Sequence, residues 1–397
     1  MSKSHPHTKG NGKDYRQWII LIVAIIAVGN GAAELLRALS SPYETDFVLF
    51  FRLAGYSVIH NVNTLYCLSC QHHLMRVLYG VGIRQGINPW AFIFAYPPFV
   101  ALAFAPFALL TPEFGLELYL LFGLSVFIVS STVLYKRSYR GPIPSFLVLL
   151  CTLPAMQVFA LGQIDVFLFA VFIWATSLMQ SDKLLDSGII LSIVLAKPQL
   201  LWILIPSLAV LGLWKVLMGI CLGGATLTAI SWFLVGWSGL HQWGIALTHI
   251  DFGENLLTVS LPGFLVRFHI SHLYIDLLSI ILVTVGIAIV WKYRTYLRGD
   301  FTITLGLVFA LTLALTPHML PYNLLFIVFP LVAISRNRKW SALGLGCALS
   351  IAYLIDNFVQ PAWSFAELLI VLCVLAEILL TVNLEFHDMK SSLADSN

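Results

Sequence analysis

Long runs of apolar residues recur through nearly the whole 397-residue chain, and they restrict its fold more than any other feature. A helix that crosses the hydrocarbon core of a bilayer needs about 20 mostly apolar residues. Here 59% of the residues are hydrophobic and 10% are charged, whereas soluble domains carry about 25% charged residues. This composition excludes a soluble enzyme, a secreted disulfide scaffold and a disordered chain. The net charge of +3 is too small and scattered to indicate a nucleic-acid partner. We therefore predict an all-α polytopic membrane protein.

The apolar runs predict about 12 transmembrane helices. The clear candidates cover 18–36, 114–135, 144–161, 164–179, 214–236, 273–291, 302–316, 320–333, 340–354 and 365–382. Two further runs are ambiguous. Segment 97–110 is short and contains Pro106, and segment 184–213 is interrupted by Lys197-Pro198-Gln199.

Clusters of basic residues predict the orientation, because short cytoplasmic loops are enriched in Lys and Arg. The clusters lie at 136–140, 292–298 and 336–339. Placing them inside gives a cytoplasmic tail at 1–17, one transmembrane domain at 18–383 and a second cytoplasmic tail at 384–397. The long outer loops are then about 40–96 and 239–272. Segment 97–110 lies along or dips into the outer leaflet, unless it is a true span and 136–140 lies outside.

Two charged residues and a histidine stand at breaks between apolar runs. A charge in hydrocarbon costs roughly 2.5–3.5 kcal/mol, so such residues suggest function. Lys197 precedes Pro198, which breaks a helix, and it suits an anionic ligand or a lipid headgroup to which it snorkels. Asp165 follows Gly162-Gln163 and either faces a cavity or caps a helix. His318 follows Pro317 and either donates to a phosphate or sugar or is a loop histidine.

The first outer segment contains Asp46, just beyond the first span. Segment 47–56 after it predicts an amphipathic helix that lies in the membrane interface. A carboxylate against an apolar surface can have a raised pKa and act as a general base. A helix N-cap is the equally supported alternative for Asp46.

Cys67, Cys70, His72 and His73 form a tight cluster in the same segment. A local disulfide, two free thiols or a metal site are all compatible with it. The disulfide is favoured over the metal because the spacing is too tight for good tetrahedral geometry.

Several of these motifs, in this order, resemble the integral-membrane glycosyltransferases of the GT-C superfamily. Within it the chain resembles glycosyltransferase family 87, the mycobacterial-type polyprenyl-phosphate-mannose-dependent mannosyltransferases that act on phosphatidylinositol mannosides. The motifs are Asp46 to Arg52, Leu65-Tyr66, Tyr96-Pro97-Pro98, Gly162-Gln163, Lys197-Pro198-Gln199 and Pro317-His318. The family often has Asp where this chain has Cys67.

The resemblance implies a GT-C fold with a juxtamembrane helical loop on the outer face, and it assigns roles to residues. Asp46 is implied as the catalytic base. The implied substrate-binding residues are His318, Lys197, Gln163, Asp165, Tyr96, Arg52 and Asn255. No cofactor and no metal are expected.

The implied activity is transfer of a sugar, expected to be mannose, from a polyprenyl-phosphate donor to a glycolipid or glycan acceptor. This would be a hexosyltransferase of the EC 2.4.1 type in the cytoplasmic (inner) membrane, with its active site on the periplasmic or extracellular side. The partners would be the donor, the acceptor and membrane lipids. The alternative is a transporter or flippase for a lipid-linked or amphipathic solute, which would use the same broken helices without chemistry.

Overall fold

The computed structural model describes residues 15–81, 93–138, 153–249, 258–268, 270–359 and 364–394, and every regular element within these ranges is a helix. The α-helices are α1 (Tyr15–Ser40), α2 (Leu53–His60), α3 (Leu68–Tyr79), α4 (Pro98–Ala108), α5 (Pro112–Ser138), α7 (Leu153–Leu161), α8 (Asp165–Gln180), α9 (Leu184–Leu191), α10 (Leu204–Val210), α11 (Trp214–His249), α12 (Leu261–Leu265), α13 (His272–Lys292), α14 (Arg294–Leu297), α15 (Phe301–Leu315), α16 (Val328–Ser335), α17 (Lys339–Val359) and α18 (Ser364–Ala394). Shorter helical turns are η1 (Pro42–Glu44), the π-helix η2 (Phe47–Arg52), η3 (Val62–Thr64), η5 (Ser192–Ala196), η6 (Pro198–Leu201), η7 (Val266–Phe268) and η8 (Pro321–Ile327). The prediction of an all-α chain is confirmed for these residues.

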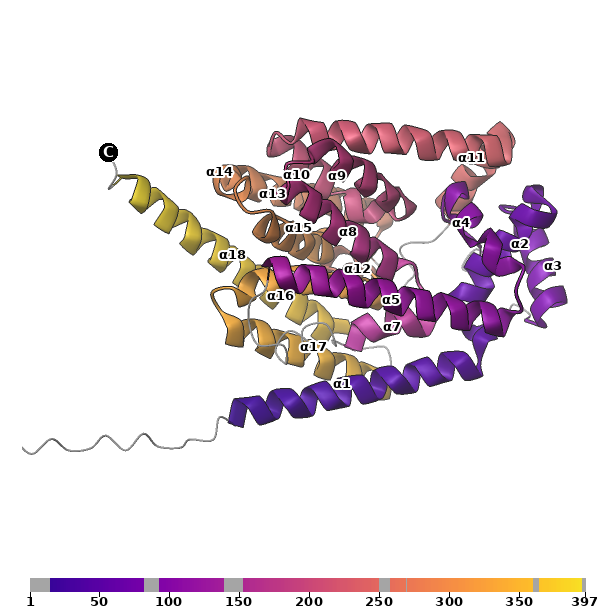
Figure 1. Cartoon of the computed structure of the whole chain (residues 1–397), viewed down its shortest axis with the longest axis horizontal. Coiled ribbons are helices and arrows are strands. Elements are labelled where there is room, and N and C mark those ends of the chain that lie inside the picture. The colour runs from indigo at the N-terminus through magenta and orange to yellow at the C-terminus, as the bar shows by residue number, and fades with distance from the viewer. Residues whose placement is uncertain are drawn as a thin grey trace, which may run out of the picture.

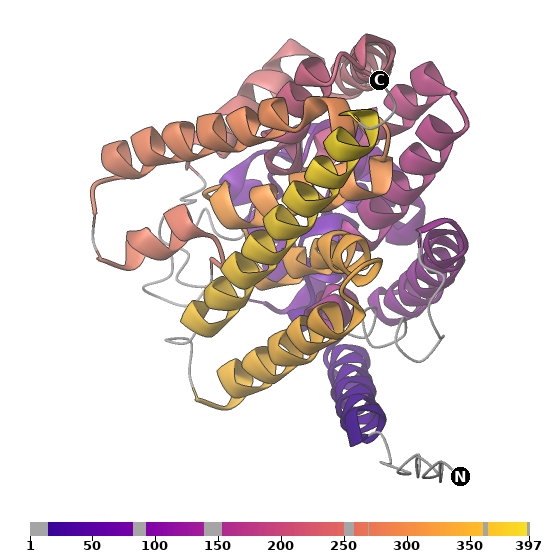
Figure 2. The same cartoon turned by 90° about the vertical axis from the view of Figure 1, so that its left-hand side faces the viewer.

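The long helices run side by side in one bundle, and the short helices α2, α3 and α4 gather at one end of it (Figure 1). We call this the loop end. At the opposite end, which faces the viewer in Figure 2, α18 crosses the foreground. Arg137, Arg336 and Lys339 line one cavity there, so we call it the basic end. Two of the three predicted cytoplasmic clusters thus meet at the same end of the bundle, as one side of a membrane requires.

Four helices in the described part of the chain are long and apolar enough to cross a membrane singly. They cover Pro112–Ser138, Trp214–Thr248, Leu273–Lys292 and Phe365–Ser392. The other apolar helices are shorter, among them Asp165–Gln180 and Phe301–Leu315. The count of about 12 crossings therefore stays a prediction. The last helix also continues through Ala394, well beyond the boundary expected at residue 383.

Segment 97–110 contains α4, a helix of 11 residues. At 1.5 Å per residue it is about 16 Å long, roughly half the thickness of a hydrocarbon core. It packs against α2, η2 and α11 at the loop end. This length fits the expectation that the segment does not cross the membrane.

The segment after Asp46 differs from its prediction. It is helical, as η2 and α2, but it does not present an apolar face to the membrane interface. Phe47, Val48, Phe51, Leu53 and Ala54 are all buried. α4 packs against both η2 and α2, and α5 packs against η2. An interfacial helix would bury one face only, whereas other helices cover more than one side of this segment. The sequence pattern predicted the helix but not the neighbours that cover it.

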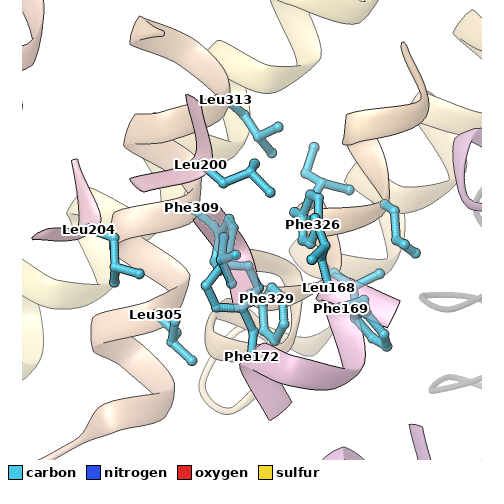
Figure 3. Close-up of a cluster of buried hydrophobic side chains, with 14 of the residues drawn as sticks. Leu168, Phe169, Phe172, Leu200, Leu204, Leu305, Phe309, Leu313, Phe326 and Phe329 are labelled. Carbon is cyan, nitrogen blue, oxygen red and sulfur yellow. The ribbon is translucent and has the colours of Figure 1, made fainter. Parts of the chain in front are cut away.

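Aromatic rings form the core under the loop end, between α8, α15, η8 and α16 (Figure 3). Phe309 of α15 stacks on Phe326 of η8, with ring centroids 5.2 Å apart, and on Phe329 of α16 at 4.8 Å. Phe172 of α8 meets Phe309 edge-on at 4.6 Å. α15 is buried along almost its whole length. This packing holds α8 and η8 in a fixed relation, and both carry residues of the site described below.

Glycines bring α9 and α11 into close contact. A Cβ at Gly188 would overlap the main-chain oxygen of Val216, and a Cβ at Gly219 would overlap that of Leu185. Four residues further along α11, Gly223 lies against the hydroxyl of Ser192. Small residues at this spacing let helix backbones approach closely in membranes. Because α9 leads through η5 directly to Lys197, the contact also fixes the position of that lysine.

Substitution of Gly219 by alanine tests this packing. Gly219→Ala should lower the unfolding temperature in detergent, because the new methyl group displaces α9 at a cost of about 1–3 kcal/mol. Gly244→Ala, beyond the kink that Gly236 makes in α11, is the control, since nothing lies within 4 Å of its new Cβ. A Gly219→Ala protein as stable as Gly244→Ala would contradict the close approach.

Candidate active site

Asp46 lies between the short turns η1 and η2 at the loop end, directly after α1. The next residue, Phe47, is fully buried and packs on the rings of Tyr119 and Phe107, with centroids 4.6 and 5.6 Å away. A Cβ at Gly162 would lie only 2.5 Å from the Phe47 Cβ. The packing of Phe47 on these rings and against Gly162 therefore holds Asp46 beside the break between α7 and α8.

That break is built by Gly162, which has a φ of +66°. The amide of Gln163 donates to the oxygen of Val158 at 2.9 Å, and that of Gly162 donates to the oxygen of Phe159 at 3.0 Å. This is the Schellman ending of a helix, for which glycine is the favoured residue. The main-chain oxygen of Gln163 also accepts from the Tyr119 hydroxyl at 2.8 Å. The backbone is thus fixed on both sides of the Gln163 side chain.

The Gln163 carboxamide forms hydrogen bonds with three of the predicted site residues. Its Oε1 accepts from the Tyr96 hydroxyl at 3.1 Å and from Lys197 Nζ at 3.2 Å. Since only the oxygen of an amide can accept, these two donors fix its orientation. Its Nε2 then donates to Oδ2 of Asp46.

Lys197 stands between η5 and η6, where Pro198 begins a new turn, and its side chain is 2% exposed. Its Nζ lies 2.5 Å from Oδ2 of Asp165, which is fully buried. The same Nζ lies 4.4 Å from the ring centroid of Tyr322. The other oxygen of Asp165 accepts from Asn323 Nδ2 at 2.8 Å. Asp165 therefore serves as the partner of a buried cation. It is the first residue of α8, and the N-cap position is occupied by Ile164.

These contacts set the charge of the site. Burial raises the pKa of the Asp46 carboxyl to about 6, and the nearby Asp165 raises it further, whereas the Gln163 hydrogen bond and the Lys197 charge oppose the rise. With Asp46 ionised, the cluster contains two carboxylates and one ammonium, which is paired with Asp165, and the net charge is −1. Near neutral pH, Asp46 is thus a mainly ionised base that is close to its proton-binding range.

The loop between α2 and α4 supports Tyr96. The Tyr66 hydroxyl donates to the main-chain oxygen of Tyr96 at 2.7 Å. Gln71 accepts from the amide of Phe94 at 3.0 Å. Cys67 and Cys70 are joined by a disulfide at the start of α3. Of the three alternatives for the cysteine and histidine cluster, the structure has the disulfide. In the ranges that the structure describes, no three His, Cys, Asp or Glu side chains are grouped to hold a metal ion.

Arg52 is not among the residues that meet at Gln163. Its Nη1 donates to the Tyr79 hydroxyl at 2.7 Å, and its Nη2 donates to the main-chain oxygen of Leu110 at 2.5 Å. The side chain is 8% exposed. It ties η2 to α3 and to the turn before α5, so these contacts favour a structural role over the predicted substrate contact.

His318 lies in the turn between α15 and η8. The next residue, Met319, accepts a hydrogen bond at 2.7 Å from the amide of Val259. Leu320, one residue further, donates to Asn323 at 2.9 Å. His318 therefore lies beside the cluster, on the segment that supplies Asn323. The remaining predicted residue, Asn255, lies outside the described residues.

A model of glycosyltransferase family 87 matches residues 94–320, more than half of the chain. The chain belongs to glycosyltransferase family 87. No curated protein and no solved structure matches it significantly. The family 87 match includes Tyr96, Gln163, Asp165, Lys197 and His318, which are the predicted site residues in and beside the cluster apart from Asp46. Asp46 precedes the matched region, so its place in the cluster rests on the structure.

Sequence reasoning missed three residues of this cluster, namely Tyr119, Tyr322 and Asn323. Tyr119 lies in the middle of a long apolar helix, where a tyrosine is unremarkable. Tyr322 and Asn323 follow Pro321, only a few residues after His318. An asparagine inside an otherwise apolar run was the available signal, because a buried amide needs hydrogen-bond partners.

Removal of the Lys197 charge should destabilise the protein, because it leaves Asp165 buried without its cation. Lys197→Met should lower the unfolding temperature strongly, equivalent to about 3–5 kcal/mol. The double variant Lys197→Met, Asp165→Asn should recover much of this loss, because neither charge then remains. Lys215→Met, an exposed site on α11, is the control and should have little effect. A Lys197→Met protein as stable as the control would show that the two charges do not depend on each other.

Proposed function

We propose that this glycosyltransferase moves a mannosyl group from a polyprenyl-phosphate donor to a lipid or glycan acceptor, with Asp46 as the general base. The observation that carries the proposal is the hydrogen bond from Gln163 to Asp46 Oδ2. It supports a carboxylate of fixed orientation whose other oxygen, Oδ1, takes the proton of the acceptor hydroxyl. A positioned base of this kind contributes typically 10²–10⁴-fold to rate.

The proposed reaction is a single displacement. The acceptor oxygen attacks the anomeric carbon as Asp46 removes its proton, and the bond from that carbon to the phosphate oxygen breaks. The electron pair of that bond stays on the polyprenyl phosphate, which leaves with one more negative charge. One attack on the face opposite the leaving group inverts the anomeric configuration. The polyprenyl chain stays in the bilayer, which suits a site at one end of a membrane-embedded bundle.

The charge of the cluster refines the proposed roles of Lys197 and His318. Lys197 already has Asp165 as its counter-ion, so it contributes mainly by orienting Gln163 and by favouring ionised Asp46. With a net charge of −1, the cluster itself repels a phosphodiester. We therefore assign the donor phosphate to the side of His318, in the neighbouring turn, where an imidazole donates a hydrogen bond to the growing charge.

The family membership favours this proposal over the transporter alternative. A transporter would use the same broken helices and buried Lys197 without chemistry, and it needs no oriented base. Purified protein incubated with radiolabelled polyprenyl-phosphate mannose and membrane lipids separates the two. Transfer of label to an acceptor supports the transferase, whereas donor movement across the bilayer without transfer supports the transporter.

Asp46→Asn should lower the rate of sugar transfer by about 100-fold or more, because the amide keeps the shape and cannot take the proton. The native enzyme should also lose activity as the pH falls through about 6, because protonation of Asp46 removes the base. The measurement is kcat/KM for transfer from the radiolabelled donor between pH 5 and 8.

The matched control is Glu44→Gln, which removes an exposed carboxylate two residues away and should leave the rate unchanged. Asp46→Asn with more than about a tenth of the native rate would exclude Asp46 as the base. A rate that does not change between pH 5 and 7 would exclude the assigned proton transfer.

The loop end should face away from the cytoplasm. A cysteine introduced as Asn63→Cys in η3 should react with a membrane-impermeant maleimide in intact cells. One introduced as Lys136→Cys, near the end of α5, should react only after the cells are permeabilised. Both positions are exposed, so access decides the result. Labelling of position 136 and protection of position 63 would place the site on the cytoplasmic side.

A further inference from the structure

The cavity at the basic end has a volume of about 880 Å³ and lies far along the bundle from Asp46. It is formed by the ends of α5, α8 and α16 and by the beginnings of α15 and α17. Its volume is within the range of sites that hold small molecules, about 300–1,000 Å³. The glycosyl-transfer site at the loop end shares no residue with it.

The basic side chains of this cavity are only partly neutralised. Arg336 pairs with Asp300. Among the residues that the structure describes, the guanidinium of Arg137 has only long contacts, of 3.5 Å, with Gln180 Oε1 and the main-chain oxygen of Ser177. The Lys339 ammonium lies 5.5 Å from the ring centroid of Trp340.

Within the described ranges, no carboxylate forms a salt bridge with Arg137 or Lys339. Three cations and the two carboxylates of Asp182 and Asp300 line the cavity, which leaves a net charge of +1. This balance favours an anionic ligand with a single negative charge.

An apolar crevice continues from the cavity into the bundle. The two share Arg137, Ser138, Gln180 and Thr302 at their junction. Beyond the junction, the crevice is narrow, with about 20 Å³ of space, and its walls are mainly apolar side chains of α5, α8, α15 and α16, among them Leu134, together with Thr176 and Ser177. A cationic cavity between the helix ends of a membrane-embedded bundle is complementary to the headgroup of an anionic lipid.

We propose that this cavity binds the headgroup of an anionic glycerophospholipid from the leaflet at the basic end. The phosphodiester lies between Arg137 and Lys339. The hydroxyls of Ser138 and Thr302, which are 3.1 Å apart, bond the glycerol and ester oxygens. The acyl chains stay in the leaflet outside the cavity. The site is a lipid-binding site separate from the site of sugar transfer.

The test compares lipids of different charge on the purified full-length protein in a neutral detergent. Short-chain phosphatidylglycerol should raise the unfolding temperature in a concentration-dependent way, because a ligand of the folded state stabilises it. Phosphatidylcholine with the same chains, and inorganic phosphate, should give little or no shift. Stabilisation by inorganic phosphate equal to that by phosphatidylglycerol would overturn the lipid assignment in favour of a soluble anion.

Charge variants locate the site. Arg137→Gln with Lys339→Gln should weaken the apparent affinity for phosphatidylglycerol roughly 30-fold, because each basic side chain near an anionic lipid contributes about fivefold. Lys215→Gln with Lys292→Gln removes the same charge from exposed positions that do not line the cavity, and should keep the native affinity.

Equal weakening in both double variants would overturn the proposal, because the attraction would then be a general effect of net charge. The single variant Lys339→Gln, at a partly exposed helix start, is the second measurement if the double variant does not fold. It should weaken the affinity about fivefold. Native affinity in that variant would also overturn the proposal.

Discussion

The buried ion pair of Lys197 and Asp165 is the interaction on which the rest of the site depends. Each charge alone would cost roughly 2.5–3.5 kcal/mol in hydrocarbon. Together they compensate each other, and further hydrogen bonds from Asn323 to Asp165 and from Lys197 to Gln163 satisfy them. A buried pair contributes little net stability by itself. Its effect here is to fix orientation, because the Gln163 amide is held so that its nitrogen faces Asp46.

The polar residues of the cluster, apart from Tyr119 inside α5, lie at or beside places where a helix is interrupted or begins. Gly162 ends α7, Pro198 separates η5 from η6, and Pro321 starts η8. In a membrane, irregular backbone is tolerated where it is buried in protein or lines a cavity. At these breaks, side chains from separate helices therefore contact one another. The aromatic core packs between the helices that carry the breaks and holds them in a fixed relation (Figure 3).

The helical class and the positions of these breaks could be predicted from the sequence, because apolar length and proline or glycine placement are local signals. Asp165 and Lys197 stood out for the same reason, as did Asp46 beyond the first helix, whereas Tyr96 and Gln163 were assigned to the site through the family resemblance. Which of them touch could not be predicted, since the contacts join distant segments. Arg52 looked functional beside Asp46, but its partners are a tyrosine of α3 and main-chain oxygens before α5. The burial of η2 also depends on its contact with α4, and this contact cannot be inferred from the pattern of residues 47–56.

The ion pair has a consequence for how the protein is made. α8 runs away from the loop end and α9 returns to it, so Asp165 and Lys197 lie at the open ends of one helical hairpin. If the hairpin enters the bilayer as a unit, the insertion machinery meets a neutral pair rather than two isolated charges. Asn323 is translated much later, so the second partner of Asp165 is supplied only after α15 has entered. The full hydrogen bonding of the cluster would therefore form at a late step of biogenesis, after the scaffold around it is already embedded.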